Sequence, residues 1–336
     1  MIALVDAVSC YAHMEKGFDV SLRNKLVCVV SNNDGAIVAL CPIAKRLGIP
    51  KFAPLFKVKD LIRKHNVVVR SSNYELYADI SAKMMQVIGH LADEQYVYSI
   101  DECFLEFENY EKIIDNWYEY GHKIRRAVYQ QTRMPVGVGF GAILTLSKAA
   151  NHAAKKLSGY VGVAVIDNEV QRIGILKRMA TTDVWGIGSR LGKHLDMMDI
   201  KSAYQLCAQD PKLMRNAFSV VVQRTVTELQ GVKCLSWDMT PPIKKEIFST
   251  RSFGTRITDP APLRAALAPH SSIITKKARD QGSLLKRIMV FAASSPHDNR
   301  PYSKSIRVEF PVPTDNTLAV VQAISSAVAS LYVPGV

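Results

Sequence analysis

Residues 96–107, YVYSIDECFLEF, place two acidic side chains, Asp101 and Glu102, between two runs of aromatic and apolar residues. Runs of this composition favour β-strands, so we expect a hairpin with the carboxylates at its bend. A third carboxylate, Asp6, lies near the end of another apolar run, Ile2 to Val8, which also predicts a strand. If these strands share one sheet, the three carboxylates meet at one edge.

Clustered carboxylates repel one another, and hard divalent cations relieve that repulsion. Two Mg²⁺ ions at such a site would activate an attacking 3′ hydroxyl and stabilise a leaving pyrophosphate. The alternative is that Asp101 and Glu102 are ordinary polar residues of a turn. The apolar sequence around them favours the metal site, because burying carboxylates without a ligand is costly.

Outward from the hairpin, apolar periodicity predicts a mixture of strands and helices. The expected strands are 26–31, 67–70, 135–140 and 161–166, and the expected helices are 43–47, 60–65, 76–91, 110–131 and 145–157. A tight turn is expected at residues 32–35, NNDG. This order indicates an α/β domain with an insertion between Asp6 and the helix that starts at Leu76.

The second half of the chain has a different organisation. Residues 168–235 are predicted to form short helices, and Pro241-Pro242 marks a linker. Beyond the linker, strands are expected at 246–253, 284–293 and 303–310, with helices at 262–281 and 316–332. A glycine-containing turn, Gly186-Ile187-Gly188, is typical of a helix-hairpin-helix element, whose backbone N–H groups approach a nucleic-acid phosphate.

Charge is unevenly distributed along the 336 residues, whose formal net charge is +13. Residues 243–336 carry 13 Lys+Arg against 6 Asp+Glu, so this last part holds +7 of the total. Such an excess favours a polyanionic partner such as nucleic acid, because Lys and Arg displace counterions from phosphates. The alternative is a solvated basic face or a charged edge strand that resists aggregation.

Composition excludes several other classes of protein. Hydrophobic residues make up 48% of the chain, and none of its apolar runs approaches the roughly 18 residues that span a bilayer, so no membrane association is expected. The six cysteines show neither CxxC pairs nor Cys/His spacing. We therefore expect reduced thiols in a cytoplasmic protein and no zinc site.

Several motifs together resemble the Y family of DNA polymerases, and in particular its UmuC-type branch. Asp6 with Tyr11-Ala12 and Glu15 is similar to the first motif of the family, and Ser99-Ile100-Asp101-Glu102 to the second. The stretches that point to the UmuC type are 31–35 (SNNDG), 71–77 (SSNYELY), 136–139 (VGVG) and 147–155 (SKAANHAAK). The resemblance covers roughly residues 1–333.

The resemblance implies a right-hand polymerase architecture. A ferredoxin-like α+β palm would comprise residues 1–18 and 78–167, with fingers at 19–77. A helical thumb with its helix-hairpin-helix would follow at 168–236, then a linker at 237–245. An α/β little finger would occupy 246–336, lacking its last strand, so that an exposed sheet edge and no sliding-clamp peptide are expected within this chain.

The resemblance also implies roles for individual residues. Asp6, Asp101, Glu102 and the main-chain oxygen of Ala7 would bind two Mg²⁺ ions, with the three carboxylates catalytic. Residues expected to contact the nucleotide are Cys10, Tyr11 as steric gate, Lys45 and Lys155, and those expected to contact DNA are Gly186, Ile187, Gly188, Arg251 and Arg256. The alternative for Tyr11 is a half-buried core aromatic, and the neighbouring motif favours the gate. Lys148 lies seven residues before Lys155 and therefore on the same helix face. Lysines on that face would either bind a phosphate or face solvent.

Three positions depart from the family pattern around the nascent base pair. Cys10 replaces an aromatic residue, Leu40-Cys41-Pro42 replaces a polar start of the fingers helix, and Leu144 replaces a basic or polar residue. These departures leave the expected metal ligands intact.

Three functions are compatible with the sequence. The first is an error-prone translesion DNA polymerase of the bacterial SOS response, using Mg²⁺, dNTPs and primed DNA, with a UmuD′-type dimer and a RecA-type filament as partners. The second is a catalytically weak homologue that occupies damaged primer ends or sequesters UmuD-type partners. The third, a nucleotide cyclase, is disfavoured because it needs neither the hairpin at 186–188 nor a basic last domain.

Overall fold

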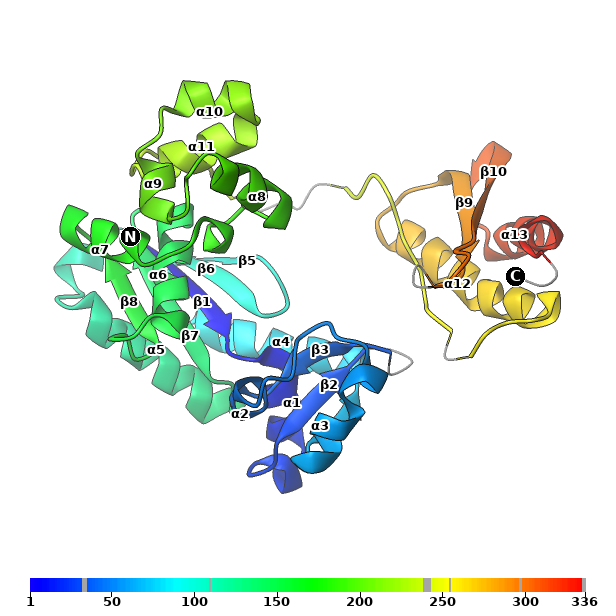
Figure 1. The fold of residues 1–336 in the computed structure, drawn as a ribbon, viewed down its shortest axis with the longest axis horizontal. Coiled ribbons are helices and arrows are strands. Elements are labelled where there is room, and N and C mark those ends of the chain that lie inside the picture. The colour runs from blue at the N-terminus through cyan, green and yellow to red at the C-terminus, as the bar shows by residue number, and fades with distance from the viewer. Residues whose placement is uncertain (32–34, 109, 238–242, 254, 296–297, 334–336) are drawn as a thin grey trace. The chain divides into compact units, whose positions relative to one another are not determined.

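The computed structural model describes residues 1–31, 35–108, 110–237, 243–253, 255–295 and 298–333. The chain divides into two compact units (Figure 1): of the described residues, the first contains 1–31 and 36–237, and the second contains Gly35 and those from 243 onward. The expected tight turn at 32–35 and most of the expected linker lie outside the described residues.

A five-stranded sheet, ordered β5-β6-β1-β7-β8, forms the centre of the first unit. Its strands are β1 (Ile2–Ala7), β5 (Glu94–Val97), β6 (Glu102–Glu106), β7 (Val136–Gly141) and β8 (Val163–Ile166). All neighbours are antiparallel except β7 and β8. The register places Asp6 opposite both Glu102 and Gly137, so the expected strands of Asp6 and of the hairpin do share one sheet.

Helices cover both faces of this sheet (Figure 1). They are α4 (Tyr74–Gly89), α5 (Trp117–Thr132) and α6 (Leu144–Lys156). On one face Phe140 of β7 lies against Trp117 of α5, with ring centroids 5.3 Å apart. The opposite face of β7 presents three glycines at alternate positions, Gly137, Gly139 and Gly141, and α6 lies directly on them.

The close approach of α6 depends on those glycines. A Cβ atom on Gly139 would lie only 2.0 Å from the main-chain nitrogen of Asn151, and one on Gly141 would lie 2.6 Å from that of Ser147. Without Cβ atoms on β7, the helix backbone comes within reach of the sheet, and the buried Asn151 amide donates to the carbonyls of Leu4 (3.0 Å) and Gly137 (2.9 Å). The glycine face therefore determines where the side chains of α6 lie.

A smaller sheet, ordered β3-β2-β4, belongs to the same unit. It consists of β2 (Val27–Val30), β3 (Ile37–Leu40) and β4 (Val68–Ser71), accompanied by α1 (Cys10–Phe18), α2 (Pro42–Arg46) and α3 (Lys59–Lys64). We did not predict β3. Its short apolar run has no alternation, because three of its four residues are buried, and so periodicity alone did not reveal a strand.

Residues after β8 form the predicted short helices. These are α7 (Glu169–Lys177), α8 (Ser189–Met197), α9 (Ala203–Cys207), α10 (Pro211–Ala217) and α11 (Val220–Leu229). Glu228 of α11 is fully buried and joins this region to α6. Its Oε2 accepts from the main-chain nitrogen (3.2 Å) and hydroxyl (2.5 Å) of Thr145, and its Oε1 from the nitrogens of Cys234 (3.0 Å) and Leu235 (2.7 Å).

Replacing Glu228 with alanine is expected to lower the free energy of unfolding by about 3 kcal/mol, because the two buried donors of Thr145 and two partly buried main-chain donors lose their acceptor. Thermal or urea unfolding followed by circular dichroism measures the change. Glu169→Ala is the matched control, since Glu169 is an exposed partner of Arg172, and a change of less than about 1 kcal/mol is expected there. Equal effects of the two substitutions would contradict this account of Glu228.

The second unit contains an antiparallel pair of strands and two helices. They are α12 (Pro260–Asp280), β9 (Leu285–Ala293), β10 (Ser303–Thr314) and α13 (Thr317–Leu331). The predicted strand at 246–253 is wrong. None of the described side chains in that segment is buried, so strand pairing there gains no support from a core. Among the described residues the sheet has only these two strands.

Two further observations concern the cysteines and the helices. All six cysteines are free, and four of them are buried. Within the described residues, no helix combines the length and the hydropathy that spanning a bilayer requires.

Candidate active site

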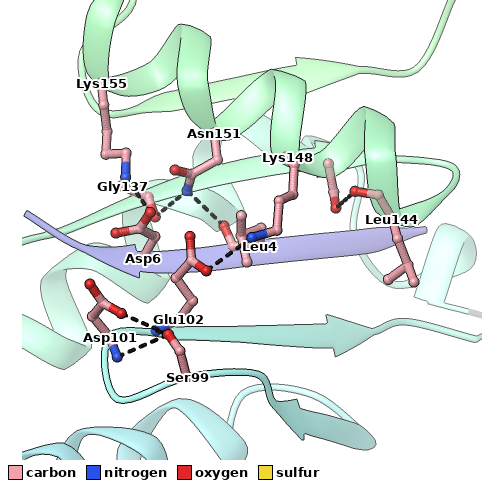
Figure 2. Close-up of polar contacts among 11 residues, drawn as sticks. Leu4, Asp6, Ser99, Asp101, Glu102, Gly137, Leu144, Lys148, Asn151 and Lys155 are labelled. Atoms are coloured by element: carbon pink, nitrogen blue, oxygen red, sulfur yellow. Dashed lines mark hydrogen bonds and ion pairs between the residues drawn. The ribbon is translucent and has the colours of Figure 1, made fainter. Parts of the chain in front are cut away.

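The structure brings Asp6, Asp101 and Glu102 to one end of β1 and β6 (Figure 2). Asp6 is the penultimate residue of β1, Glu102 begins β6, and Asp101 belongs to the preceding turn. The main-chain nitrogen of Ala7 donates to the carbonyl of Asp101 at 2.8 Å, which ties the turn to the end of β1. The predicted meeting of three carboxylates at one sheet edge is therefore present.

Each of these carboxylates has a partner from the chain itself. Lys155 forms an ion pair with Asp6, and the Nζ atom of Lys148 lies 2.9 Å from Oε2 of Glu102 (Figure 2). The Ser99 hydroxyl donates to Oδ1 of Asp101 at 2.7 Å. In this arrangement the described residues contain no group of three His, Cys, Asp or Glu side chains placed to enclose a metal ion.

The electrostatics of the carboxylates nevertheless suit divalent cations. Burial raises the pKa of Asp6 to about 7, the Lys155 ammonium opposes that rise, and the neighbouring Glu102 adds to it. Two carboxylates that face each other on adjacent strands each attract one ammonium group, so this edge of the sheet binds positive charge. Carboxylate oxygens are also the ligands that Mg²⁺ prefers. The residues present therefore fit a magnesium site.

Tyr11 lies beside the carboxylates in a cluster of three tyrosines. Its ring stacks on that of Tyr77 with centroids 4.6 Å apart, and Tyr74 meets it edge-on at 6.0 Å. The buried Tyr77 hydroxyl donates to the buried Glu15 at 2.6 Å, which fixes the ring behind Tyr11. Tyr11 itself is half-buried, so one face is packed while part of the ring remains accessible.

Cys10 is buried at the start of α1, where its thiol lies 3.8 Å from the sulfur of Met14. Burial, with smaller contributions from Asp101 and Asp6, raises the pKa of the Cys10 thiol well above its usual range. The neutral thiol packs against Met14, and the predicted contact of Cys10 with the nucleotide remains a prediction. Leu144 is likewise buried, in an apolar cluster with Ile2 and Leu4, which accounts for an apolar residue at that position.

Lys45 belongs to α2 and lies within electrostatic reach of α6. Partial burial lowers its pKa, and the ammonium groups of Lys156, Lys51 and Lys155 lower it further, whereas Asp6 opposes the shift. Several like charges therefore gather near Asp6 from α2, from the segment that follows α2 and from α6. An anion such as a triphosphate would relieve their mutual repulsion.

The hairpin at 186–188 directly precedes α8. Gly186 has a φ of 87°, a conformation that favours glycine, Ile187 is buried, and Gly188 is the N-cap of α8. Arg251 and Arg256 belong to the second unit, where the Arg256 guanidinium donates to both oxygens of Asp298 at 2.5 and 3.1 Å. The predicted DNA contacts of these residues remain predictions.

Sequence reasoning missed two features of this site. It grouped Lys148 with Lys155 as a phosphate or surface residue, whereas Lys148 contacts Glu102. It also assigned no role to Asn151, which links α6 to β1 and β7. The seven-residue spacing of the two lysines was a usable signal, because it places both on the face of α6 that meets the sheet.

Comparisons with known proteins cover nearly the whole chain. The chain matches the impB/mucB/samB family over residues 5–152 and the C-terminal domain of that family over residues 244–336. It is 35% identical over 334 residues to Protein MucB of Salmonella typhimurium, covering 99% of this chain and 79% of that protein. It is 37% identical over 338 residues to Protein UmuC of Salmonella typhimurium strain LT2, covering 100% and 80%.

A solved structure of a Y-family DNA polymerase chimera, built from Dbh and Dpo4, superposes with a TM-score of 0.71 at 19% identity, covering 98% of this chain and 94% of that one. The fold is therefore that of the Y-family DNA polymerases, which confirms the predicted fold class. Within that class, the chain belongs to the impB/mucB/samB family of UmuC-type subunits.

Proposed function

We propose that this chain is an error-prone, DNA-directed DNA polymerase that extends primers across damaged template positions in the SOS response. The observation that carries the proposal is the meeting of Asp6, Asp101 and Glu102 at one sheet edge in a chain of the UmuC-type family. The proposed partners are primed DNA and dNTPs, together with a UmuD′-type dimer and a RecA-type filament.

The three carboxylates and the main-chain oxygen of Ala7 would hold two Mg²⁺ ions, which supply Lewis-acid activation of the primer hydroxyl and stabilise charge on the phosphates. Lys155 and Lys45 are cations near Asp6, and they suit the triphosphate of an incoming nucleotide. Release of Lys155 from Asp6 to that triphosphate would exchange one anionic partner for another, so the ammonium group remains neutralised throughout.

The hairpin at Gly186–Gly188 would grip the duplex through main-chain N–H groups at the start of α8. A phosphate contact of this kind carries no sequence information, as a polymerase that copies any template requires. Arg251 and Arg256 of the basic second unit would add further phosphate contacts.

Primer extension on four templates that differ in one base tests the proposal. Addition of only the complementary dNTP, dependent on Mg²⁺ and abolished by a chelator, is the expected result. Retained primer-template binding without addition, even after supplying a UmuD′-type dimer and a RecA-type filament, would favour a binding protein that occupies primer ends. A cyclic product from ATP or GTP alone would favour a cyclase.

Replacing Tyr11 with alanine is expected to lower the discrimination against ribonucleotides by about 100-fold, because the ring that crowds a 2′ hydroxyl is lost. The ratio of kcat/KM for dCTP and CTP measures the effect. Tyr129→Ala, at an exposed tyrosine of α5, should leave the ratio unchanged. A Tyr11 variant that still rejects CTP as strongly as the unaltered protein would exclude Tyr11 as the gate.

A further inference from the structure

Lys148 occupies an aromatic box beside the carboxylates. Its Nζ atom lies 4.3 Å from the ring centroid of Tyr98, 5.1 Å from that of Trp185 and 5.7 Å from that of Phe104. The three rings also contact one another, with centroid separations of 5.8 to 6.3 Å. The ammonium group therefore lies against a continuous aromatic wall and touches one anion, Glu102.

This environment differs from that of Lys155. Both lysines pair with a carboxylate, but within the part of the chain that the structure describes only Lys148 of the two also lies over aromatic rings. The Lys148 side chain is only 13% exposed and that of Glu102 20%. Cation–π attraction strengthens when the cation is shielded from water, so Lys148 is held from one side by rings and from the other by Glu102.

The contact uses one oxygen of Glu102. Lys148 donates to Oε2, while the main-chain nitrogen of Glu102 donates to the Ser99 hydroxyl oxygen at 3.1 Å. A carboxylate restrained in this way presents its remaining oxygen in a narrow range of directions. A permanent positive charge beside that oxygen also opposes the binding of a second cation.

We propose that Lys148, held in the box of Tyr98, Phe104 and Trp185, is a positioning residue that orients Glu102 and moderates the affinity of the neighbouring carboxylates for divalent cations. The inference rests on the proposed function, because it assigns Glu102 to the metal site. Trp185 directly precedes the hairpin at Gly186–Gly188, so the box also joins the metal site to the segment proposed to grip DNA.

Binding of Mn²⁺ to the intact metal-free protein, followed by the electron paramagnetic resonance of free Mn²⁺, tests the proposal. Lys148→Met removes the competing charge, so Mn²⁺ is expected to bind roughly 5-fold more tightly. At saturating Mn²⁺, primer extension is expected to fall about 10-fold, because Glu102 is no longer oriented. Lys148→Arg, which keeps the charge, should restore Mn²⁺ affinity to within about 2-fold of the unaltered protein.

Lys177→Met is the matched control, since Lys177 lies 5.1 Å from the ring centroid of Tyr204 and forms no ion pair among the described contacts. It loses the same charge and the same kind of ring contact, and Mn²⁺ affinity should not change. Trp185→Leu should tighten Mn²⁺ binding by about 2-fold, and adding it to Lys148→Met should produce no further change, because both act through one contact.

The Mn²⁺ titrations distinguish a failure of the role proposed for Lys148 from a failure of the proposed function. Unchanged or weaker Mn²⁺ binding by Lys148→Met, when Asp101→Ala clearly loses binding, would overturn the role of Lys148 alone. Equal Mn²⁺ binding by the unaltered protein and by Asp101→Ala would instead overturn the metal site, and with it both proposals. Melting curves by circular dichroism show that each variant is folded under the conditions of the assay.

Discussion

Replacement of Asp101 by alanine should abolish measurable templated addition, with a loss of at least about 1000-fold in kcat, or about 4 kcal/mol. The carboxylate is one of the proposed metal ligands, and the charge that develops on the phosphates would lose its stabilising cations. Single-turnover primer extension with saturating dNTP measures the loss, and a binding titration with labelled primer-template shows that DNA binding is retained.

The substitution removes little from the fold, which is what makes the experiment informative. The Asp101 side chain accepts one bond from Ser99, whose hydroxyl keeps the main-chain nitrogens of Asp101 and Glu102 as donors. The bond from Ala7 goes to the main-chain oxygen of Asp101 and is unaffected. Asp60→Ala, at a side chain that is 99% exposed, is the control. A variant that loses less than about 10-fold would remove Asp101 from the catalytic site.

The sequence predicted the position of these carboxylates because they lie at strand ends. Apolar runs around Asp6 and around Asp101-Glu102 are long enough to be recognised as strands, and acidic residues at their ends are unusual without a ligand. The pairing of β1 with β6 then places Asp6 opposite Glu102. The strand pattern and the positions of the acidic residues therefore led to the same expectation, and Asp6 and Glu102 do lie on neighbouring strands of one sheet.

The environment of Lys148 could not be predicted in the same way. Its three aromatic neighbours come from β5–β6 and from the segment before α8, at Tyr98, Phe104 and Trp185. Which face of α6 meets which ring depends on how closely the helix approaches β7, and periodicity does not encode that distance. The strand predicted at 246–253 is wrong for a different reason. Its residues favour β-structure, but they have no core to pack against.

Replacement of Gly139 by alanine should destabilise the first unit more than the addition of a methyl group at any other glycine of that unit. The added Cβ would lie 2.0 Å from the main-chain nitrogen of Asn151, 2.5 Å from its Cα and 2.6 Å from the carbonyl carbon of Ala150. These are helix backbone atoms, so α6 must move as a whole. We expect a loss of about 3 kcal/mol or more in the free energy of unfolding, which lowers the Tm by roughly 6 to 12 °C.

The same displacement should reach the carboxylates, because Lys148 and Lys155 are carried by α6. At a temperature where the variant is folded, templated addition is expected to fall about 100-fold, the typical cost of a 1 Å misplacement near a reacting centre. Gly174→Ala is the control, since nothing lies within 4 Å of a Cβ at that position in α7, and its Tm should stay the same or rise slightly.

Gly137→Ala distinguishes displacement of the helix from displacement of one side chain. Its Cβ would meet the Lys155 stem at 2.7 Å, and a flexible side chain can move aside at little cost in stability. We therefore expect a nearly normal Tm and a raised KM for dNTP, because Lys155 is moved while α6 stays in place. If Gly137→Ala lowered the Tm as much as Gly139→Ala, or if Gly139→Ala kept full activity, the glycine face of β7 would not be what positions the lysines.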